Sequence, residues 1–407
     1  MISLGDARDR VLRDCRPLDI VEVAVDDAIG LVTAEEVLAP EDVPPFANTA
    51  MDGFAVVAAD TAGASEEAPV RLPVVGTVAA GTRDPVTVAA GHAARIMTGA
   101  AIPPGADAVV MVELCRPSAD GDEVEVLAEV APGNHVRPAG DDLRAGDVVI
   151  APGLELTAGH LGLLAGVGRS HVRVVRRARV GVMSTGDELV DGGAALAPGQ
   201  IRDANRHSLL ALLRDLGCEA VDLGIVADDV AAIRAAIVDG VGSCDALVTS
   251  GGVSMGDFDF VKVVLDELGD MDWMQVAIRP AKPLAFGTVD GVPVFGLPGN
   301  PVSSMVSFEL FARPGLRQMM GHEDTGRSVV TAVADEGLAR EADGKIHLVR
   351  IVASVVDDGK VHVRSAGGQG SHQLSAMAAA NALAVVPDGP GVEPGGPVEA
   401  ILLGRPL

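Results

Sequence analysis

Two glycine-rich turns carry the side chains best suited to chemistry in this chain. Residues 249–260 read Thr-Ser-Gly-Gly-Val-Ser-Met-Gly-Asp-Phe-Asp-Phe, and residues 296–303 read Gly-Leu-Pro-Gly-Asn-Pro-Val-Ser. Each follows a short apolar run and precedes a helical pattern, which is how an α/β sheet builds an anion site at the carboxyl ends of its strands. The backbone amides at Gly251 and Gly252 and the hydroxyls of Ser250 and Ser254 are therefore predicted to bind phosphate groups. A tight turn without a ligand is the alternative for either motif alone.

Carboxylates follow several of the predicted strands. They form three pairs, Asp187 with Glu188, Asp228 with Asp229, and Asp257 with Asp259. Because the carboxyl ends of parallel strands share one edge of a doubly wound sheet, the pairs are predicted to gather there. Carboxylates beside bound phosphates are typical of a Mg²⁺ site. Helix capping is the alternative for Asp228, Asp229 and Asp257, whereas it explains Glu188 and Asp259 less well.

Two cations lie between prolines just before the second glycine turn. Residues 277–283 read Ala-Ile-Arg-Pro-Ala-Lys-Pro and contain Arg279 and Lys282. The prolines stiffen the backbone that carries these side chains. A fixed pair of cations suits an oxyanion. Their position next to the glycine turn favours a role in the same site over a solvated surface pair.

Other polar segments lie outside the glycine turns. Residues 48–54 form a polar loop that contains Asp52, and Thr98 precedes a glycine at the end of a predicted strand. Residues 367–372 form a donor-rich loop, and Arg350 ends a strand. Each of these segments, taken alone, is more often structural than functional.

The composition narrows the classes of function. The 407 residues include 57 acidic and 31 basic side chains, a net charge of -26, which disfavours nucleic acid and anionic membranes as partners. The four cysteines form no Cys-x-x-Cys and the nine histidines form no His-Glu-x-x-His, so zinc sites of those kinds are not expected. The sequence also lacks a Gly-x-Ser-x-Gly elbow and a complete phosphate-binding P-loop. Without a recognisable signal peptide or membrane-spanning run, we expect a cytoplasmic protein.

The apolar periodicity predicts several domains of different kinds. Ser3 can cap an amphipathic helix over 3–15, and a strand and a second helix are expected within 18–38. Valine-rich runs between turns predict a small β domain over 47–146. Strand–helix alternation over 178–320 predicts a doubly wound sheet, whose last helix begins with Asn300 as N-cap and Pro301 as its first residue. Short strands over 329–407 predict a β-barrel or sandwich.

The expected fold class is therefore α/β plus β, with a central doubly wound α/β domain, an inserted small β domain and a C-terminal β-barrel. The predicted domains are 1–46 with 147–177 (a discontinuous helix/strand domain), 47–146 (the inserted β domain), 178–326 (the α/β domain) and 327–407 (the β-barrel).

Seven motifs, in this order along nearly the full chain, resemble a single family. They are Pro-Phe-Ala-Asn-Thr-Ala-Met-Asp-Gly-Phe-Ala-Val at 45–56, Ile-Met-Thr-Gly at 96–99, Ser-Thr-Gly-Asp-Glu-Leu at 184–189, Ser-Gly-Gly-Val-Ser-Met-Gly-Asp at 250–257, Pro-Ala-Lys-Pro at 280–283, Leu-Pro-Gly-Asn-Pro-Val-Ser at 297–303 and Gln-Gly-Ser-His at 369–372. The set resembles the molybdopterin molybdenumtransferases, which are related to the gephyrin E domain.

The resemblance implies an enzyme of molybdenum cofactor biosynthesis. Such enzymes insert molybdate into the dithiolene of adenylylated molybdopterin and release AMP with Mg²⁺ present. The family forms a homodimer of elongated four-domain subunits, whose α/β domain is of the molybdopterin-binding type. The active site lies where this domain of one subunit faces the inserted domain of the other. Further partners implied are molybdopterin adenylyltransferase and the apo-molybdoenzymes that receive the cofactor.

The resemblance also implies roles for single residues. Glu188, Asp228 and Asp259 hold Mg²⁺ or orient the water that cleaves the pyrophosphate bond. Arg279 and Lys282 hold molybdate or phosphate, and Asp52 closes the site from the other subunit. The residues assigned to binding of the pterin nucleotide are Thr98, Asp142, Ser250, Gly251, Gly252, Ser254, Pro298, Gly299, Asn300, Pro301, Arg350 and Ser371. The chain departs from the family pattern at three positions. They are Gln275 and Arg279, both often lysine, and Ala281, often glycine.

Two other functions stay open at this point. A molybdopterin adenylyltransferase uses a similar α/β domain, but the extra β domains and residues 48–54 favour the metal-inserting enzyme. A non-catalytic dimeric scaffold that binds a partner peptide, as gephyrin does, is less consistent with the acidic and basic residues gathered at the crevice.

Overall fold

The computed structural model describes residues 1–84, 86–193, 195–252 and 260–404. The chain separates into two units. The first contains residues 1–34, 153–157 and 172–407, and the second contains residues 35–152 and 158–171. None of the helices in these described ranges is long and apolar enough to cross a membrane.

A six-stranded mixed sheet forms the centre of the first unit. Its strand order is β17-β14-β18-β22-β21-β19, with β14 at Arg179–Thr185, β17 at Glu219–Val226, β18 at Ala246–Ser250, β19 at Gly269–Gln275, β21 at Pro283–Val289 and β22 at Val292–Leu297. The first four strands in that order are parallel, while β21 and β19 are antiparallel to their neighbours. The reversal between β21 and β22 follows from Asp290 and Gly291, whose positive φ angles of 51° and 82° suit a two-residue hairpin turn.

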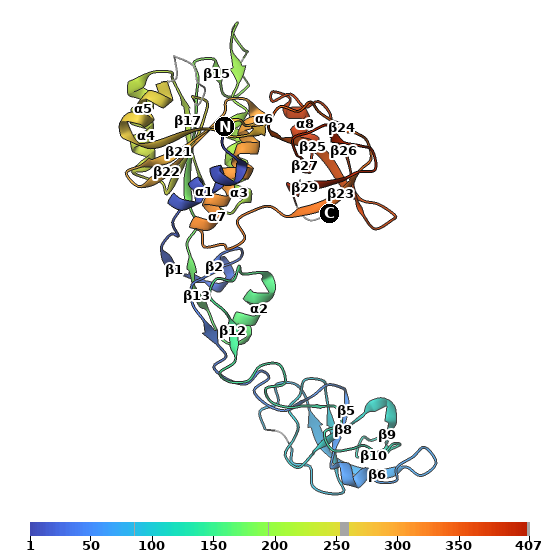
Figure 1. Cartoon of the computed structure of the whole chain (residues 1–407). Coiled ribbons are helices and arrows are strands. Elements are labelled where there is room, and N and C mark those ends of the chain that lie inside the picture. Colours follow the sequence, from blue (N-terminus) through green and yellow to red (C-terminus); the bar gives the residue numbers. More distant parts are fainter. Residues whose placement is uncertain (85, 194, 253–259, 405–407) are drawn as a thin grey trace. The chain divides into compact units, whose positions relative to one another are not determined.

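Helices cover both faces of this sheet (Figure 1), so the predicted doubly wound arrangement is confirmed. One face packs against α1 (Leu4–Asp14), α3 (Asn205–Asp215), α6 (Pro301–Ser307) and α7 (Arg313–Met319). The other face packs against α4 (Val230–Val241) and α5 (Phe260–Leu268). Most of the contacts are made by aliphatic side chains such as Val11, Leu213 and Ile233, and burying each is worth about 1.5–3 kcal/mol. Phenylalanines also contribute, among them Phe286 and Phe295, whose ring centroids are 5.1 Å apart.

The structure of the N-terminal segment agrees with the prediction at α1 and differs from it after that helix. The Oγ of Ser3 accepts a hydrogen bond from the Asp6 amide at 3.0 Å, so the predicted cap is confirmed. The second helix expected within 18–38 is wrong, because only a 3-10 turn forms at Val25–Asp27. Gly30, with φ of 72°, ends the helical conformation three residues later. The flanking strands β1 (Ile20–Ala24) and β2 (Val32–Thr33) pair with β13 (His171–Val175) in a three-stranded sheet.

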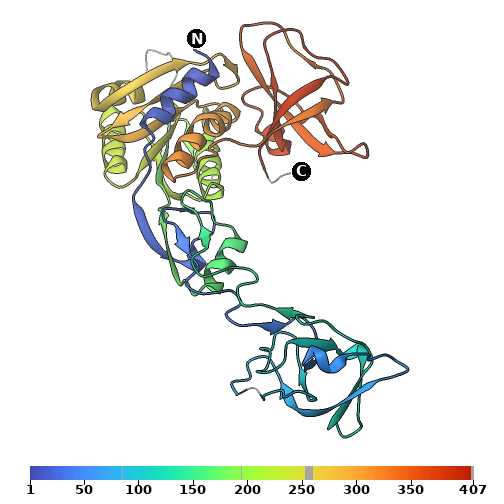
Figure 2. The same ribbon diagram turned by 60° about the horizontal axis from the view of Figure 1, so that its bottom comes forward.

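The C-terminal part of the first unit is a closed five-stranded β-barrel (Figure 2). Its order is β25-β26-β23-β29-β27, closed by pairing of β25 with β27, and its strands are β23 (Val329–Ala334), β25 (Ile346–Val355), β26 (Val361–Ser365), β27 (Ala382–Val386) and β29 (Pro397–Leu402). The short helix α8 (Leu374–Ala379) follows the loop 367–372. Strand β20 (Ile278–Arg279) adds to the barrel by parallel pairing with β25, which ties the Arg279 segment to it.

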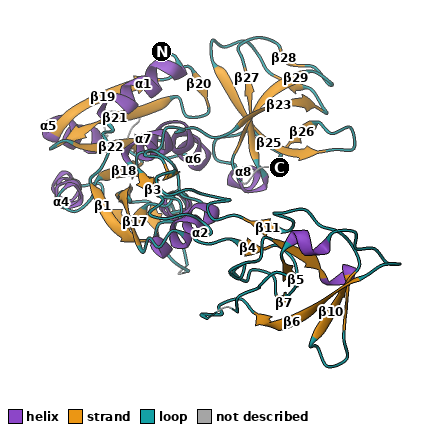
Figure 3. Cartoon of the chain, turned by 90° about the horizontal axis from the view of Figure 1, so that it is seen from below, coloured by secondary structure: helices purple, strands orange, loops and turns teal. Residues whose placement is uncertain are grey.

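The second unit is built on a six-stranded β-sheet of order β8-β5-β7-β6-β10-β9 (Figure 3). These strands are β5 (Gly53–Val56), β6 (Val70–Val78), β7 (Ala93–Ile96), β8 (Ala108–Met111), β9 (Cys115–Pro117) and β10 (Glu123–Val126). The unit also contains two separate two-stranded sheets, β4 (Asn48–Thr49) with β11 (Val136–Arg137), and β3 (Val37–Leu38) with β12 (Val148–Ile150). Helix α2 (Ala158–Gly166) completes the unit.

Candidate functional site

A cavity of about 490 Å³ lies at the carboxyl ends of the parallel strands in the first unit. Both glycine turns and two of the predicted carboxylates line it. The predicted site residues in its lining are Glu188, Asp228, Ser250, Gly251, Gly252, Pro298, Gly299 and Asn300. Ser254 and Asp259, and with them Asp257, lie outside the described residues. Pro301 is one residue beyond this lining, as the first residue of α6, and Asn300 is its N-cap without a side-chain cap bond.

The two glycine turns approach each other closely. Gly251 has φ of 98°, and a Cβ built there would come within 3.0 Å of the Thr185 carbonyl oxygen. A Cβ built on Gly299 would reach the Cα of Gly251 at 3.7 Å. Backbone therefore packs directly on backbone at the floor of the cavity, and glycine at 251 is required by both its conformation and its surroundings.

Asn205, the first residue of α3, connects the two turns and was not predicted from the sequence. Its Nδ2 donates to the Ser250 Oγ at 2.8 Å and to the Gly299 carbonyl oxygen at 2.7 Å. Asn205 also lines the cavity. The sequence signal for it is weak, since it is one asparagine at the start of an amphipathic helix.

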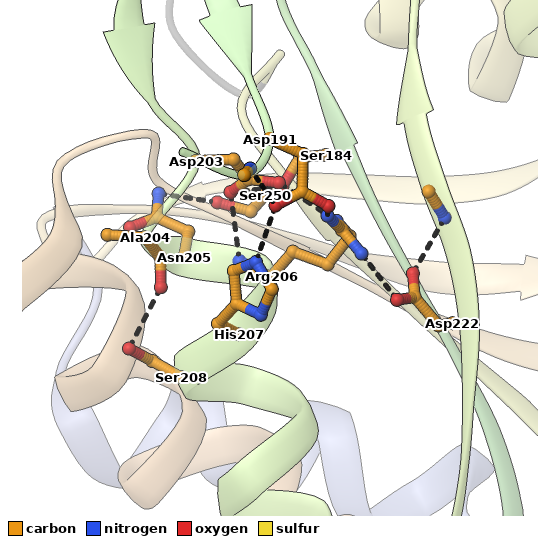
Figure 4. A network of polar contacts seen from close by, with 12 residues as sticks. Ser184, Asp191, Asp203, Ala204, Asn205, Arg206, His207, Ser208, Asp222 and Ser250 are labelled. Atoms are coloured by element: carbon orange, nitrogen blue, oxygen red, sulfur yellow. Dashed lines mark hydrogen bonds and ion pairs between the residues drawn. The ribbon is translucent and has the colours of Figure 1, made fainter. Parts of the chain in front are cut away.

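The residue after Asn205 is held by three carboxylates (Figure 4). Arg206 is buried, with 3% of its surface exposed. Its Nε donates to Asp203 at 3.0 Å, and its two Nη atoms pair with Asp222 and Asp191. Asp203 is also buried and accepts from the Ser184 Oγ at 3.1 Å. The network joins β14, β17 and the start of α3, so it fixes the position of Asn205 relative to the sheet.

The acidic side of the cavity gathers carboxylates from two strand ends. The Asp228 amide donates to Asp187 Oδ1 at 3.1 Å. Partial burial raises the pKa of Asp228, and the nearby charges of Asp187 and Glu188 raise it further. Asp229 is the helix cap, because its Oδ1 accepts from the Ala232 amide at 2.9 Å. Because Asp229 caps the helix, the Asp228 carboxylate is not needed as a cap and can interact with a ligand in the cavity.

No group of three metal-ligating side chains is found within the described ranges, and Asp259 is outside them. Two carboxylates that face one cavity beside phosphate-binding turns still match the chemistry of Mg²⁺, which takes few protein oxygens together with substrate phosphates. Burial raises the pKa of Asp228 most and the charges of Asp187 and Glu188 raise it further, and a bound cation would offset both effects.

The absence of a side chain at Gly186 leaves space for the Glu188 carboxylate. Filling that space tests whether the position of this carboxylate matters for activity. A Cβ on Gly186 would lie 2.7 Å from Glu188 Oε2, and φ at Gly186 is 149°. We expect Gly186→Ala to displace the carboxylate and lower turnover about 10²-fold, measured as product release per enzyme. Gly359→Ala is the matched control, because Gly359 has φ of 76° with nothing within 4 Å of its added Cβ. Equal turnover in the two variants would show that the position of Glu188 does not matter.

A second cavity of about 440 Å³ adjoins the first and contains the predicted cations. Its lining includes Arg279, Lys282 and Ser371. It also includes His372, which lies in the predicted loop 367–372 but was assigned no role, and Lys345, which sequence reasoning missed. The two cavities share Pro283, Pro298 and Asn300. The carboxylate-lined and cation-lined spaces are therefore neighbours in the same unit.

The turn between Arg279 and Lys282 has an unusual backbone. Ala281 is a non-glycine residue with φ of 71°, and it is 3% exposed. Left-handed backbone is costly for a residue with a Cβ. This explains physically why glycine suits that position, and Pro280 and Pro283 help to hold the turn in the strained form.

Arg350 lies in a different environment from the other predicted binding residues. The expectation that Arg350 ends a strand is wrong, because it lies within β25 (Ile346–Val355). It is fully buried, and its Nη2 donates to the carbonyl oxygens of Gly368 at 2.7 Å and Gly370 at 3.2 Å. Its backbone amide donates to Gln369 Oε1 at 2.9 Å. Burial lowers the pKa of Arg350. The guanidinium therefore shapes the loop that carries Ser371, whose carbonyl oxygen accepts from the Val302 amide at 3.1 Å.

The remaining predicted residues belong to the second unit. Asp52 Oδ1 accepts from the Thr98 amide at 2.7 Å and from Thr98 Oγ1 at 2.8 Å. These two hydrogen bonds hold the pKa of Asp52 below its usual value. Asp142 is exposed after β11, and its amide donates to the Val43 carbonyl oxygen at 3.0 Å. The structure thus joins Asp52 to Thr98 by two hydrogen bonds that favour the carboxylate form of Asp52.

The Asp52–Thr98 pair predicts a measurable titration change. Thr98→Val removes the hydroxyl donor and keeps the backbone donor, so the pKa of Asp52 should rise part of the way towards its ordinary value. Carboxyl-carbon chemical shifts followed through a pH titration would measure it. Asp120, whose pKa is lowered by Ser118 and nearby amides, should be unchanged in the same spectra. An unaltered Asp52 titration would contradict the assigned role of the hydroxyl.

Comparison with known families matches the chain in three consecutive parts. Residues 2–168 match the family described as "MoeA N-terminal region (domain I and II)", residues 181–318 match "Probable molybdopterin binding domain", and residues 336–403 match "MoeA C-terminal region (domain IV)".

Individual relatives agree with this over nearly the full length. The chain is 37% identical to a molybdopterin molybdenumtransferase of Haemophilus influenzae, over 95% of this chain and 94% of that protein. It is 40% identical to molybdopterin molybdenumtransferase 2 of Mycobacterium tuberculosis, over 93% of each. The crystal structure of a molybdopterin biosynthesis MoeA protein from Pyrococcus horikoshii OT3 matches with a TM-score of 0.82 at 28% identity, covering 99% of this chain and 100% of that one. On these grounds the chain belongs to the molybdopterin molybdenumtransferase family.

Proposed function

We propose that this protein inserts molybdate into adenylylated molybdopterin and releases AMP, with Mg²⁺ as cofactor. The observation that carries the proposal is the pair of adjoining cavities that share Pro283, Pro298 and Asn300. One combines glycine turns with carboxylates, and the other combines the cations Arg279, Lys282 and Lys345 with the loop that carries Ser371. A pterin nucleotide and a tetrahedral metal oxyanion require that combination of neighbouring chemistries.

The glycine turns are proposed to bind the phosphates of the nucleotide. The amide of Gly252 and the hydroxyl of Ser250 supply neutral donors, which matters in a chain of net charge -26. The expectation that the Gly251 amide binds phosphate is wrong, because that amide already donates to the Leu297 carbonyl oxygen at 3.1 Å. Gly299 and Asn300 would complete the cradle from the second turn. Ser254, outside the described residues, stays a predicted donor of the same kind.

The cationic cavity is proposed to hold molybdate. Arg279 and Lys282 would neutralise the oxyanion, and Ser371 would donate to one of its oxygens. Arg350 would act through the loop whose carbonyl oxygens it holds. Lys345 would contribute less, because its Nζ already pairs with Asp343 at 2.7 Å.

Glu188 and Asp228, with Asp259 outside the described residues, are the proposed ligands of Mg²⁺. Bound there, Mg²⁺ would supply neutralisation of charge on the phosphate oxygens. The same carboxylates are proposed to orient the water that attacks phosphorus. The pyrophosphate P–O bond then breaks and AMP leaves from the glycine-turn cavity.

The active form is proposed to be a homodimer, in which Asp52 of the partner subunit completes the site. Its lowered pKa keeps it ionised at neutral pH, so it could bind a cation or accept a hydrogen bond from the pterin. Light scattering of the purified protein would test the dimer. Mixing inactive Asp52→Asn and Lys282→Ala subunits would test the shared site, since restored turnover requires one intact site per mixed dimer.

The experiment that tests the function is AMP release from adenylylated molybdopterin by the purified protein. It is performed with Mg²⁺, with and without molybdate. Molybdate-dependent release that yields cofactor able to reactivate a molybdoenzyme apoprotein is the expected result. Tight binding without release would instead support a non-catalytic scaffold or carrier, and Gln275 would be the first residue to replace with lysine.

A further inference from the structure

The side-chain amide of Asn205 uses both of its N–H groups to join segments that are 49 residues apart in sequence, Ser250 and Gly299. The distances of 2.8 and 2.7 Å are those of well-formed hydrogen bonds. Asn205 is half-buried at the start of α3 and lines the 490 Å³ cavity between the two turns. One side chain thus fixes the distance between the two glycine turns.

We infer that Asn205 is a positioning residue that locks the two glycine turns together and aims the Ser250 hydroxyl at a bound phosphate group. The inference rests on the proposed phosphate-binding role of the cavity and adds a residue that the family resemblance did not supply. It makes the loops a preorganised site rather than two independent turns.

The hydrogen bond to Ser250 decides what that hydroxyl can do. A serine hydroxyl has one proton and two acceptor lone pairs. Because Asn205 donates to the oxygen, one lone pair is occupied and the proton remains to donate elsewhere. Ser250 is 2% exposed yet lines the cavity, so a phosphate oxygen there is the acceptor that this arrangement suits.

The hydrogen bond to Gly299 fixes a peptide plane in the second turn. The carbonyl group of Gly299 and the N–H of Asn300 belong to one trans peptide and point in opposite directions. Holding the carbonyl oxygen at 2.7 Å from Asn205 therefore also fixes the direction of the Asn300 amide. Asn300 lines both cavities, so this amide is a second donor whose orientation depends on Asn205.

Asn205 is itself held rigidly by its neighbour. Arg206 is anchored to Asp191, Asp203 and Asp222, and Figure 4 draws Asn205 and Ser250 beside this network. A mobile asparagine would lose side-chain entropy each time the turns closed. Anchoring the adjacent residue removes much of that cost before any ligand arrives.

The chemistry also explains why asparagine is needed at this position. Leucine would offer no donor, and aspartate would offer only acceptors to two oxygen atoms that are themselves acceptors here. Aspartate would also add a charge to a cavity that already contains Glu188 and Asp228. Either change should weaken binding of a phosphate group more than it alters the fold.

The test measures calorimetric binding of AMP by the full chain in a double-mutant cycle. We expect Asn205→Ala and Ser250→Ala each to bind AMP about tenfold more weakly. The double variant should bind no more weakly than the Asn205→Ala variant, because the Ser250 hydroxyl contributes to binding only when Asn205 orients it. Asn205→Asp, nearly the same shape, is included so that a folding defect of the alanine variant does not decide the result, and it should bind at least as weakly.

Asn381→Ala is the matched control. Its side chain likewise bridges backbone, through Nδ2 to the Ala353 carbonyl oxygen at 2.8 Å and Oδ1 to the Ala353 amide at 2.7 Å, but in the barrel. It should lower the melting temperature without changing AMP affinity. Additive effects in the cycle, wild-type affinity in both Asn205 variants, or a wild-type chain that binds no AMP would each overturn the inference. Wild-type binding with the expected coupling but no AMP release from the pterin substrate would refute the proposed function alone.

Discussion

Replacing Arg206 with methionine is expected to lower the free energy of unfolding by about 3–5 kcal/mol, the usual cost of removing one partner from a buried ion pair. The guanidinium is 3% exposed and is the common partner of three carboxylates. Without it, Asp203, which is 5% exposed, keeps a charge that only neutral donors such as Ser184 can meet. Methionine has a similar volume, so the loss reports charge rather than a cavity. Urea unfolding followed by circular dichroism would measure it.

Arg179→Met is the control for the Arg206 variant. Arg179 pairs with Glu219 at 3.0 Å, but 47% and 60% of the two side chains are exposed. Exposed pairs contribute about 0–1 kcal/mol, so this variant should unfold almost as the wild type does. Equal losses in the two variants would mean that the buried network does not stabilise the fold.

The ion pairs of Arg206 also predict how the free energy of unfolding changes at acid pH. Hydrogen bonds from His207 and Arg206 lower the pKa of Asp191 to about 2, and the same arginine lowers that of Asp222 against the opposing effect of its burial. A carboxylate with a lowered pKa stabilises the fold above its unfolded pKa, and that contribution is lost as pH falls towards the folded value. The wild type should therefore lose stability between about pH 4 and 2. The Arg206 variant should lose less over the same range, although His207 still lowers the pKa of Asp191.

Lys282→Ala is expected to lower kcat/KM for molybdate insertion about 10²–10³-fold, the typical cost of removing one group that stabilises developing charge. Lys282 lines the cationic cavity with Arg279, in a protein whose net charge of -26 repels anions. AMP release at varied molybdate concentrations would measure the change, and much of it should appear as a raised KM for molybdate. Lys282→Arg keeps the charge and should lose less.

Lys360→Ala is the matched control, because Lys360 is exposed in the hairpin between β25 and β26 and lines neither cavity. Its kinetics should equal those of the wild type. A Lys282→Ala variant with the same molybdate dependence as that control would remove the lysine from the proposed mechanism.

The sequence predicted the elements that local patterns determine. Ser3 capped its helix, the strand–helix alternation formed the doubly wound sheet, and both glycine turns came to one edge of it. These follow from short-range periodicity and from the rule that parallel strands end on the same side. The second helix expected within 18–38 failed because Gly30 stops the helical conformation after one turn.

What the sequence could not supply depends on contacts between distant segments. Asn205 bridges two turns only because the fold brings the first residue of α3 within hydrogen-bond distance of both, and no local pattern encodes that. Arg350 matched a family position, yet only the fold reveals that it is buried behind the loop bearing Ser371. Likewise, the choice of Asp229 rather than Asp228 as helix cap was settled by geometry, because both aspartates fit the pattern equally well.

The four buried cysteines allow local unfolding of the native protein to be measured without an engineered label. Burial raises the pKa of Cys15, Cys115 and Cys218 to about 12, so their thiols stay protonated and enclosed while the fold is intact. Alkylation needs an exposed thiolate, so each site reacts only when its own surroundings open. Cys115 lies in the second unit and the other three lie in the first. Mass spectrometry of timed alkylation would therefore give a separate opening rate for each unit of the unmodified wild-type chain.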